Sequence, residues 1–397
     1  MTKIYAKQRS HEVRAKTVTM VVLITASWAA VTSSCSSAPA NARGGPRVVR
    51  VSCADASQDA ATLQQAIDAS PAGAVIEIQA GTCLLTRGIA LLANRTYTGG
   101  NAAGTVLKQD GRMSYVLASQ AYAANSSTTG DPLAIRDLTV ACDGSGGTNG
   151  IVVMNWHADV RRVDVTGCGG SGIVDTNTTA NGTAIKNTSV NSRFDDNFIT
   201  ASGRYGFEVH DSGNAVTDGF LTGNQIGSSA NDAIHLDNAA GWDISGNHLY
   251  KDGQDGIVAM RLYGTTISGN YIEDFGDRQD SGTWYGIALT VQSGGASTIF
   301  GNKVLNNRGE TAGAKHIYVS AAKVGGANRG GGYLSVTGNI ILSVRPDDVG
   351  FFFSGSSSSS SSSSGASRLV VASSGNEVAG AGTARKSAGP ATITGGI

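Results

Sequence analysis

The chain repeats a short pattern of alternating hydrophobic and polar positions that ends in Gly-Asn. The pattern occurs as FLTGNQI, DISGNHL, TISGNYI, TIFGNKV and SVTGNII, with its asparagines at Asn224, Asn247, Asn270, Asn302 and Asn339. The first three asparagines are 23 residues apart, and the later intervals widen to 32 and 37 residues. Strict alternation over a few residues predicts β-strands that bury one face.

A second motif, an aliphatic residue that often follows glycine and starts another alternating run, trails the first. It occurs as NGIVVMN, SGIVDTN, YGFEVHD, DAIHLDN, DGIVAMR, YGIALTV and KHIYVSA. Two short strands in each period of about 23 residues predict stacked coils, because one coil cannot bury its own apolar residues. We therefore predict an all-β fold, a right-handed parallel β-helix. An all-β sandwich is the alternative, but sandwiches do not repeat Gly-Asn at a constant offset from Gly-Ile. The recurrent asparagines are expected to stack in an interior turn and satisfy backbone groups from coil to coil.

The first part of this domain predicts a capping helix. Residues 57–69, SQDAATLQQAIDA, place Ala60, Leu63 and Ile67 on one helical face, with Ser57 as the expected N-cap. Such a helix covers the exposed end of a β stack. Residues 51–397 are expected to form a single β-helix domain, in which the Ser-rich segment 354–367 is a loop before one last coil.

The N-terminal residues 1–35 are interpreted as an export leader. A basic segment precedes the apolar run Thr17–Val31, which is too short and isolated for a membrane span. Cys35 in VTSSC is a candidate lipidated residue, and the alternative is cleavage at Ala40–Ala42. Residues 36–50 are expected to be a linker. Both alternatives predict a secreted protein or a cell-surface lipoprotein that touches the membrane only through the lipid.

Cysteine usage agrees with export. Apart from Cys35, the chain has Cys53, Cys83, Cys142 and Cys168, an even number without a CxxC or Cys/His cluster, which favours two disulfides over a metal site. We place Cys142 and Cys168 at the position of the recurrent asparagine in earlier coils. Neighbouring coils lie about 4.8 Å apart, which suits a disulfide. The predicted pairs are therefore Cys142–Cys168 and Cys53–Cys83.

The charge balance limits the classes of partner. Lys plus Arg and Asp plus Glu number 30 each, so the formal net charge is zero. A nucleic-acid-binding protein would show a basic excess, and none is expected here. An acidic substrate would have to be held by local basic groups.

Strand alternation predicts which side chains leave the core. In YGFEVHD, Glu208 and His210 point outward, and in the next coil His235 and Asp237 do so. Registering the coils on their aliphatic residues places Glu208 beside His235 and His210 beside Asp237. Tyr205 precedes its strand, and the residues expected at the same place in later coils are Asp232, Asp255 and Tyr285. Two histidines among carboxylates, with apolar neighbours on both sides, favour a functional patch over solvated decoration.

YGFEVHD resembles the Tyr-Gly-aliphatic-Asp-Pro-His-Asp signature of mannuronan C5-epimerases, which act on alginate. The resemblance implies that Tyr205 and His210 are the catalytic tyrosine and histidine, and that Asp237 is a further active-site aspartate. Glu208 stands where that family has Asp, and Val209 where it has Pro. The opening DAATLQQAIDA…AVIEIQAGTCLL also resembles the start of these enzymes and of pectate-lyase-like proteins.

These residues suit proton abstraction at C5 of a uronate, once the substrate carboxylate is neutralised. Glu208 or Asp237, protonated by mutual crowding, is expected to hydrogen-bond that carboxylate, while His210 and Tyr205 exchange protons with C5 from opposite faces. Reprotonation gives epimerisation, and expulsion of the 4-linked sugar gives β-elimination.

Further residues are candidates for substrate binding. They are His235, Arg261, Trp284 and Tyr285, with Lys186 and Arg193 as other cations for carboxylates. Trp284 and Tyr285 either stack on sugar rings or are strand-edge aromatics. The expected partner is an acidic polysaccharide and the chain is expected to be monomeric. No cofactor is required, and calcium has no support in the sequence.

Three other functions stay open. A β-helix glycoside hydrolase would use paired carboxylates from Asp195, Asp196, Asp232 and Asp237, but polygalacturonase-like Gly-His-Gly and Arg-Ile-Lys motifs are absent. A calcium-dependent lyase would need clustered aspartates and an arginine. A glycan-binding or adhesin β-helix would leave the patch as solvated decoration.

Overall fold

Short parallel β-strands make up most of the described chain. The computed structural model describes residues 45–54, 56–278, 282–292, 294–307, 313–321, 332–355 and 368–397. The expected leader with Cys35, most of the linker and residues 356–367 of the Ser-rich segment lie outside these ranges. Neither helix within the ranges is long and apolar enough to cross a membrane.

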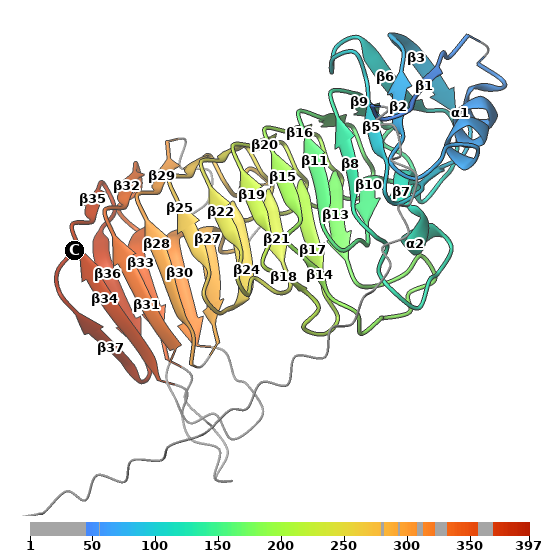
Figure 1. Cartoon of the computed structure of the whole chain (residues 1–397). Coiled ribbons are helices and arrows are strands. Elements are labelled where there is room, and N and C mark those ends of the chain that lie inside the picture. The colour runs from blue at the N-terminus through green and yellow to red at the C-terminus, as the bar shows by residue number, and fades with distance from the viewer. Residues whose placement is uncertain are drawn as a thin grey trace, which may run out of the picture. The chain divides into compact units, whose positions relative to one another are not determined.

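The strands of the described residues form three long parallel sheets, which the chain visits in turn (Figure 1). Sheet A contains β1 (Val48–Val51), β2 (Val75–Ile78), β5 (Thr96–Thr98), β8 (Leu133–Arg136), β11 (Ala158–Arg161), β15 (Arg193–Asp195), β19 (Phe220–Thr222), β22 (Asp243–Ser245), β25 (Thr266–Ser268), β28 (Ala296–Phe300), β31 (Gly332–Thr337), β34 (Leu369–Ser374) and β37 (Ala391–Thr394). Sheet B contains β3 (Gly81–Leu85), β6 (Thr105–Gln109), β9 (Thr139–Ala141), β12 (Asp164–Thr166), β16 (Phe198–Thr200), β20 (Gln225–Gly227), β23 (His248–Tyr250), β26 (Tyr271–Glu273), β29 (Lys303–Asn306), β32 (Ile340–Ser343) and β35 (Glu377–Ala379). Sheet C contains β4 (Ile89–Leu91), β7 (Tyr115–Ser119), β10 (Asn149–Val153), β13 (Ile173–Thr176), β17 (Phe207–His210), β21 (Ile234–Leu236), β24 (Ile257–Leu262), β27 (Tyr285–Val291), β30 (Lys315–Ala321), β33 (Val349–Ser354) and β36 (Thr383–Ala388). A small pair, β14 (Ser189–Val190) and β18 (Val216–Thr217), lies apart from these sheets.

Stacking of the coils buries the apolar positions, as the alternation predicts. In sheet C, Ile173, Phe207, Ile234 and Ile257 are aligned on neighbouring strands and are all fully buried. Each of these residues packs on the one above and the one below, so a continuous core replaces the core that a single coil lacks. The predicted parallel β-helix is confirmed.

The recurrent asparagines form an interior ladder at the corner between sheets A and B. The Nδ2 atom of Asn224 donates to Oδ1 of Asn247 at 2.9 Å, and Asn247 repeats this bond to Asn270 at the same distance. The backbone N–H of Asn224 donates to the same Oδ1 atom of Asn247. The ladder runs further than the motif suggests, from Asn197 to Asn376. Buried amides are therefore satisfied from coil to coil, as expected.

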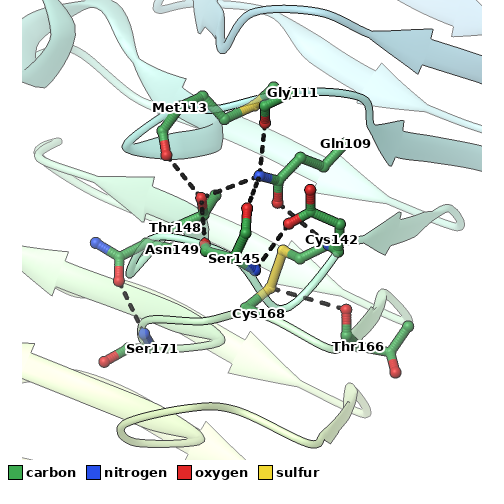
Figure 2. The surroundings of a disulfide bond; sticks show 11 residues. Gln109, Gly111, Met113, Cys142, Ser145, Thr148, Asn149, Thr166, Cys168 and Ser171 are labelled. Carbon is green, nitrogen blue, oxygen red and sulfur yellow. Dashed lines mark hydrogen bonds between the residues drawn. A yellow bond between two sulfur atoms is a disulfide. The ribbon is translucent and has the colours of Figure 1, made fainter.

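The disulfides are those predicted, Cys53–Cys83 and Cys142–Cys168, but the place assigned to the second pair is wrong. Val163 precedes β12 as Asn197 precedes β16, so Val163 holds the asparagine position in its coil. Cys142 and Cys168 instead follow the strands of sheet B, at the next corner (Figure 2). Glycine precedes Cys168 as it precedes the recurrent asparagines, although Cys142 follows an alanine, so glycine alone does not identify a corner.

The N-terminal elements differ from expectation in two details. Helix α1 spans Asp59–Asp68, and its N-cap is Gln58 rather than Ser57. Residues 48–50 belong to the expected linker by position, yet with Val51 they form β1, which pairs in parallel with β2 as the first strand of sheet A. α1 packs against β1, β3 and β4 with Ala60, Leu63 and Ile67 buried, so it covers the first coil as predicted.

Candidate active site

The candidate site lies on the outer face of sheet C, where β17 and β21 run side by side. The pairing places Glu208 next to His235, and the backbone N–H of Asp237 donates to the carbonyl of Val209. Phe207 and Val209 belong to the core. The predicted register of these two coils is therefore confirmed, and it leaves the intervening side chains on the outer face.

A chain of alternating acids and imidazoles crosses the two coils. Nδ1 of His210 lies 3.2 Å from Oδ2 of Asp237. The other oxygen of Asp237 lies 3.5 Å from Nε2 of His235, whose Nδ1 is 2.7 Å from Oδ2 of Asp232. Both ring nitrogens of His235 are thus engaged by carboxylates. His210 has only Nδ1 engaged in this chain, and 43% of its side chain is exposed.

Within this row of acids and imidazoles, each carboxylate favours the charged form of the neighbouring imidazole, and both imidazoles favour the charged form of Asp237. Burial opposes a charged His235, but Asp232 and Asp237 outweigh burial and raise its pKa to about 9. The hydrogen bond with Asp237 raises the pKa of His210 above its ordinary value, although burial opposes this. Burial would raise the pKa of Asp237, but hydrogen bonds from both histidines hold it well below its usual range. Asp237 is therefore an anion at neutral pH, and His235 a cation.

This result corrects the expectation for Asp237. Crowding with Glu208 was expected to protonate Asp237, but hydrogen bonds from two imidazoles hold its carboxylate in the ionised form. Glu208 has a different environment: it is 3% exposed and accepts a 2.5 Å hydrogen bond from the Ser171 hydroxyl. Its other oxygen lies 3.3 Å from Nη2 of Arg204 and 4.0 Å from Nδ1 of His210.

Tyr205 lies against this chain rather than apart from it. Its ring stacks on the His235 ring with centroids 4.2 Å apart, and the guanidinium of Arg204 lies 4.7 Å from its centroid. Burial raises the pKa of Tyr205, and the charge of Asp232 acts in the same direction. The phenol therefore stays protonated over a wide pH range, as a proton donor must.

The carboxylates after Tyr205 in the same column support the backbone. The N–H of Asp255 donates to Oδ1 of Asp232 at 3.1 Å, and the N–H of Tyr285 donates to Oδ1 of Asp255 at 2.6 Å. Burial raises the pKa of Asp255 to about 8, and the nearby charge of Asp232 adds to the effect. Asp232 thus connects the backbone N–H of Asp255, through one carboxylate oxygen, to the imidazole of His235, through the other.

Apolar side chains border the patch on both sides, as expected. Val174 is aligned with Glu208 and belongs to a small cluster on the outer face that includes Ala118 and Val152. Tyr122, from the short helix α2 (Gln120–Ala123), packs against that cluster. On the other side Val258 is aligned with His235. This border lowers the local exposure to water, which strengthens the charge pairs between it.

The other predicted binding residues divide into two groups. His235 lies inside the patch. Arg261 is directed elsewhere: its guanidinium donates to the Gly213 carbonyl and lies 3.3 Å from Oδ1 of Asn214. Trp284 packs against the core, as a structural aromatic does. Tyr285 is in the Tyr205 column but stacks on Tyr318 at 5.0 Å.

The remaining cations and acids considered from sequence are not brought to the patch by any contact. Arg193 lies on sheet A, with its guanidinium 4.0 Å from the Phe220 ring, and Lys186 is exposed between β13 and β14. Asp195 also lies on sheet A, where it contacts Arg161, and Asp196 follows it at the corner. Of the four acids named for a hydrolase, only Asp232 and Asp237 share the site.

Sequence reasoning missed three contributors to the site. Arg204 was overlooked although it adjoins Tyr205 in the motif itself. Ser171 and Tyr122 come from earlier coils, and only the register of sheet C and the position of α2 bring them near Glu208. Across the described ranges, no group of three or more His, Cys, Asp or Glu side chains is arranged to hold a metal ion.

Comparison with known proteins identifies the family. The model of the family described as "Right handed beta helix region" matches residues 140–365, more than half of the chain. The chain belongs to this family. No curated protein sequence matches that of this right-handed β-helix protein.

Solved structures with the same fold include two epimerase modules and a tailspike protein. The mannuronan C-5 epimerase AlgE4 A-module of Azotobacter vinelandii is 17% identical with a TM-score of 0.53, covering 88% of this chain and 97% of its own. The AlgE6 A-module of the same organism is 16% identical with a TM-score of 0.52, covering 85% and 95%. The Dettilon tailspike protein is 13% identical with a TM-score of 0.53, covering 85% and 68%. At these identities the likeness shows the fold.

Proposed function

We propose that this β-helix protein is an exported enzyme that abstracts the C5 proton of a uronate unit within a polysaccharide. One observation carries the proposal: Tyr205, His210 and Asp237 meet on one outer face, although they come from two coils. The same residue types carry the motif resemblance to mannuronan C5-epimerases. Two disulfides agree with an oxidising compartment and thus with export.

His210 is the proposed base. Nδ1 is held by Asp237, which fixes the ring and leaves Nε2 as the nitrogen for the substrate. His235 is less suited to this task, because carboxylates engage both of its nitrogens and keep it charged. Its positive charge instead stabilises Asp237 and the stacked ring of Tyr205.

Tyr205 is the proposed acid on the opposite face of the sugar. In epimerisation His210 takes the C5 proton, the electron pair delocalises into the substrate carboxylate, and Tyr205 returns a proton to C5 from the other side. His210 ends protonated and Tyr205 as a phenolate, and exchange with water restores both. In β-elimination the same electron pair forms the C4–C5 double bond as the C4–O bond breaks, Tyr205 gives its proton to the departing oxygen, and an unsaturated uronate remains.

Arg204 is proposed to receive the substrate carboxylate, with Glu208 positioning its guanidinium. The guanidinium is half-exposed, adjoins Tyr205 and already faces one carboxylate at 3.3 Å. An arginine next to the reacting unit neutralises the charge that would otherwise oppose removal of the C5 proton. Glu208 keeps the guanidinium in place, while Ser171 holds Glu208.

The test is incubation of the protein with alginate and with polygalacturonate in deuterated water. Deuterium at C5 without chain cleavage indicates an epimerase, and ultraviolet absorbance of an unsaturated uronate indicates a lyase. Tyr205→Phe should abolish either signal. New reducing ends without unsaturation would replace the proposal by a hydrolase.

A glycan-binding protein without catalysis is the second candidate. It is favoured by the observation that the titratable groups of the patch pair with one another, as in a surface ion-pair network. In that case the wild-type protein would bind an acidic polysaccharide but leave its C5 hydrogens unexchanged.

A further inference from the structure

A hollow of about 420 Å³ opens at the corner between sheets B and C, beside the candidate site. Its wall includes Gly203, Asn231, Lys251, Gly253 and the small side chains of residues 228–230. Asp277 and Arg278, from the loop after β26, also line it. The volume falls in the range of about 300–1,000 Å³ that small-molecule sites occupy.

The hollow is built into the backbone. A Cβ atom on Gly203 would lie 2.3 Å from the carbonyl oxygen of Gly169, and one on Gly253 would lie 2.2 Å from that of Ala230. No side chain fits at either position. Both glycines also donate backbone hydrogen bonds to the preceding coil, so the floor does not depend on side-chain rotamers.

The lining carries a local positive charge in a chain whose net charge is zero. Lys251 and Arg278 are both exposed, and Asp277 is the one carboxylate among the residues described around the hollow that lies at its surface. Nη1 of Arg278 lies 3.5 Å from Oδ1 of Asn231, which directs the guanidinium toward the coil that carries Asp232. An anionic ligand would meet two cations and an amide here, against the single carboxylate of Asp277.

Residues of the hollow adjoin residues of the candidate site along the chain. Gly203 directly precedes Arg204 and Tyr205, and Asn231 directly precedes Asp232. The N–H of Asn231 donates to the carbonyl of Arg204 at 2.9 Å, so the two regions share the same pair of coils. Arg204 stands between them, with 52% of its side chain exposed.

We propose that this hollow binds a second anionic sugar unit of the substrate chain, next to the unit that reacts at Tyr205 and His210. The inference rests on the proposed function and adds that the substrate is a polymer with charged neighbouring units. Lysine and arginine at its wall recognise the carboxylate of that unit. The protein therefore discriminates against a single uronate and against chains in which the neighbouring sugar is neutral.

The experiment compares the full-length protein with the double variant Lys251→Ala/Arg278→Ala. Both side chains are exposed, so the fold should be retained, which circular dichroism checks. With alginate, the variant should raise KM about tenfold or more while kcat stays within about twofold, because it removes binding that ground and transition states share. Its KM should also depend less on salt concentration than that of the wild type.

The matched control is Arg50→Ala/Lys108→Ala, which removes the same charge from exposed positions in the first coils. It should leave KM unchanged. An equal rise in KM in both double variants would overturn the proposal, because the effect would then be one of overall charge. A wild-type KM in Lys251→Ala/Arg278→Ala would overturn it as well.

Direct binding separates this proposal from the proposed function. Calorimetry with alginate oligomers, dextran sulfate and neutral dextran needs no turnover. If the wild type binds the oligomers and the double variant does not, the hollow stands even where no C5 exchange occurs. If His210→Ala abolishes exchange while the double variant behaves as wild type, the proposed function is supported and the proposed binding of a second sugar unit in the hollow is wrong. Equal binding of dextran sulfate would overturn the choice of a carboxylate as the ligand.

Discussion

His210 and Asp237 come from successive coils, yet Nδ1 of the histidine lies 3.2 Å from Oδ2 of the aspartate. The pair joins a proposed base to an anion that is itself held by a second imidazole. Such a relationship exists only when two coils stack in one register. The predictions below use this pair and the groups that hold it.

Replacing His210 with alanine should lower C5 exchange by about 10²–10⁴-fold, the usual contribution of a general base. Proton NMR of alginate in deuterated water measures the rate. The control is His248→Ala, which removes another part-exposed, carboxylate-paired histidine on sheet B and should leave the rate unchanged. Full exchange by His210→Ala would remove this residue from the mechanism.

The pH profile should report the contact between His210 and Asp237. A base must be neutral, and the raised pKa of His210 places the rise of kcat/KM at a higher pH than an ordinary histidine would give. Asp237→Asn removes the negative charge that favours the imidazolium, so the rise should shift to lower pH, besides any loss of rate. Asp110→Asn, at an exposed position in β6's coil, should not shift it. An unmoved profile in Asp237→Asn would show that another group titrates.

Stability should depend on pH through His235. Its pKa is about 9 in the folded chain against an ordinary 6.5, so its charged form stabilises the fold. The contribution is fully present below about pH 6.5 and is lost as pH rises through about 9, and it amounts to on the order of 3 kcal/mol. Thermal unfolding of wild type and His235→Gln should therefore differ most at pH 6 and converge above pH 9. A constant difference would contradict the charged state of His235.

The two disulfides should differ in their effect on activity. Removing either pair with serine should cost about 2–4 kcal/mol, since the bridges close loops of similar length, with separations of 26 and 30 residues. Only loss of Cys142–Cys168 should also reduce C5 exchange. Its corner lies beside Asn149, whose Oδ1 accepts the N–H of Ser171, the residue that holds Glu208 (Figure 2). Equal activity of both variants would show that the Cys142–Cys168 corner does not influence the candidate site.

The fold can be predicted well from the sequence because the alternation of apolar and polar positions recurs from coil to coil. The outward positions of Glu208, His210, His235 and Asp237 follow from strand alternation and one register, and the structure agrees. The protonation of Asp237 could not be predicted, because it depends on distances to two imidazoles. The contribution of Arg204 depends on how a side chain turns at a corner, where alternation gives no information.

The Cys142–Cys168 pair also shows that strand alternation does not locate the corners of a coil. The pairing followed from coil spacing, but the corner was misassigned because the Gly-Cys dipeptide at Cys168 resembles Gly-Asn. Corners are distinguished by what precedes and follows each strand, and in these coils the strands of sheet B are only three residues long. An error of one residue in the position of a strand end is therefore a third of such a strand.

The asparagine ladder has a consequence for fidelity of assembly. The Oδ1 atom of each asparagine accepts hydrogen bonds from both the backbone N–H and the side-chain amide of the asparagine one coil before it, so a coil offset by a single residue would lose two hydrogen bonds inside the protein. The same offset would turn His235 inward and Leu236 outward on a different sheet. Asn224 and Asn247 therefore favour one alignment of neighbouring coils at their corner. The same alignment brings His210 next to Asp237 on another face of the protein.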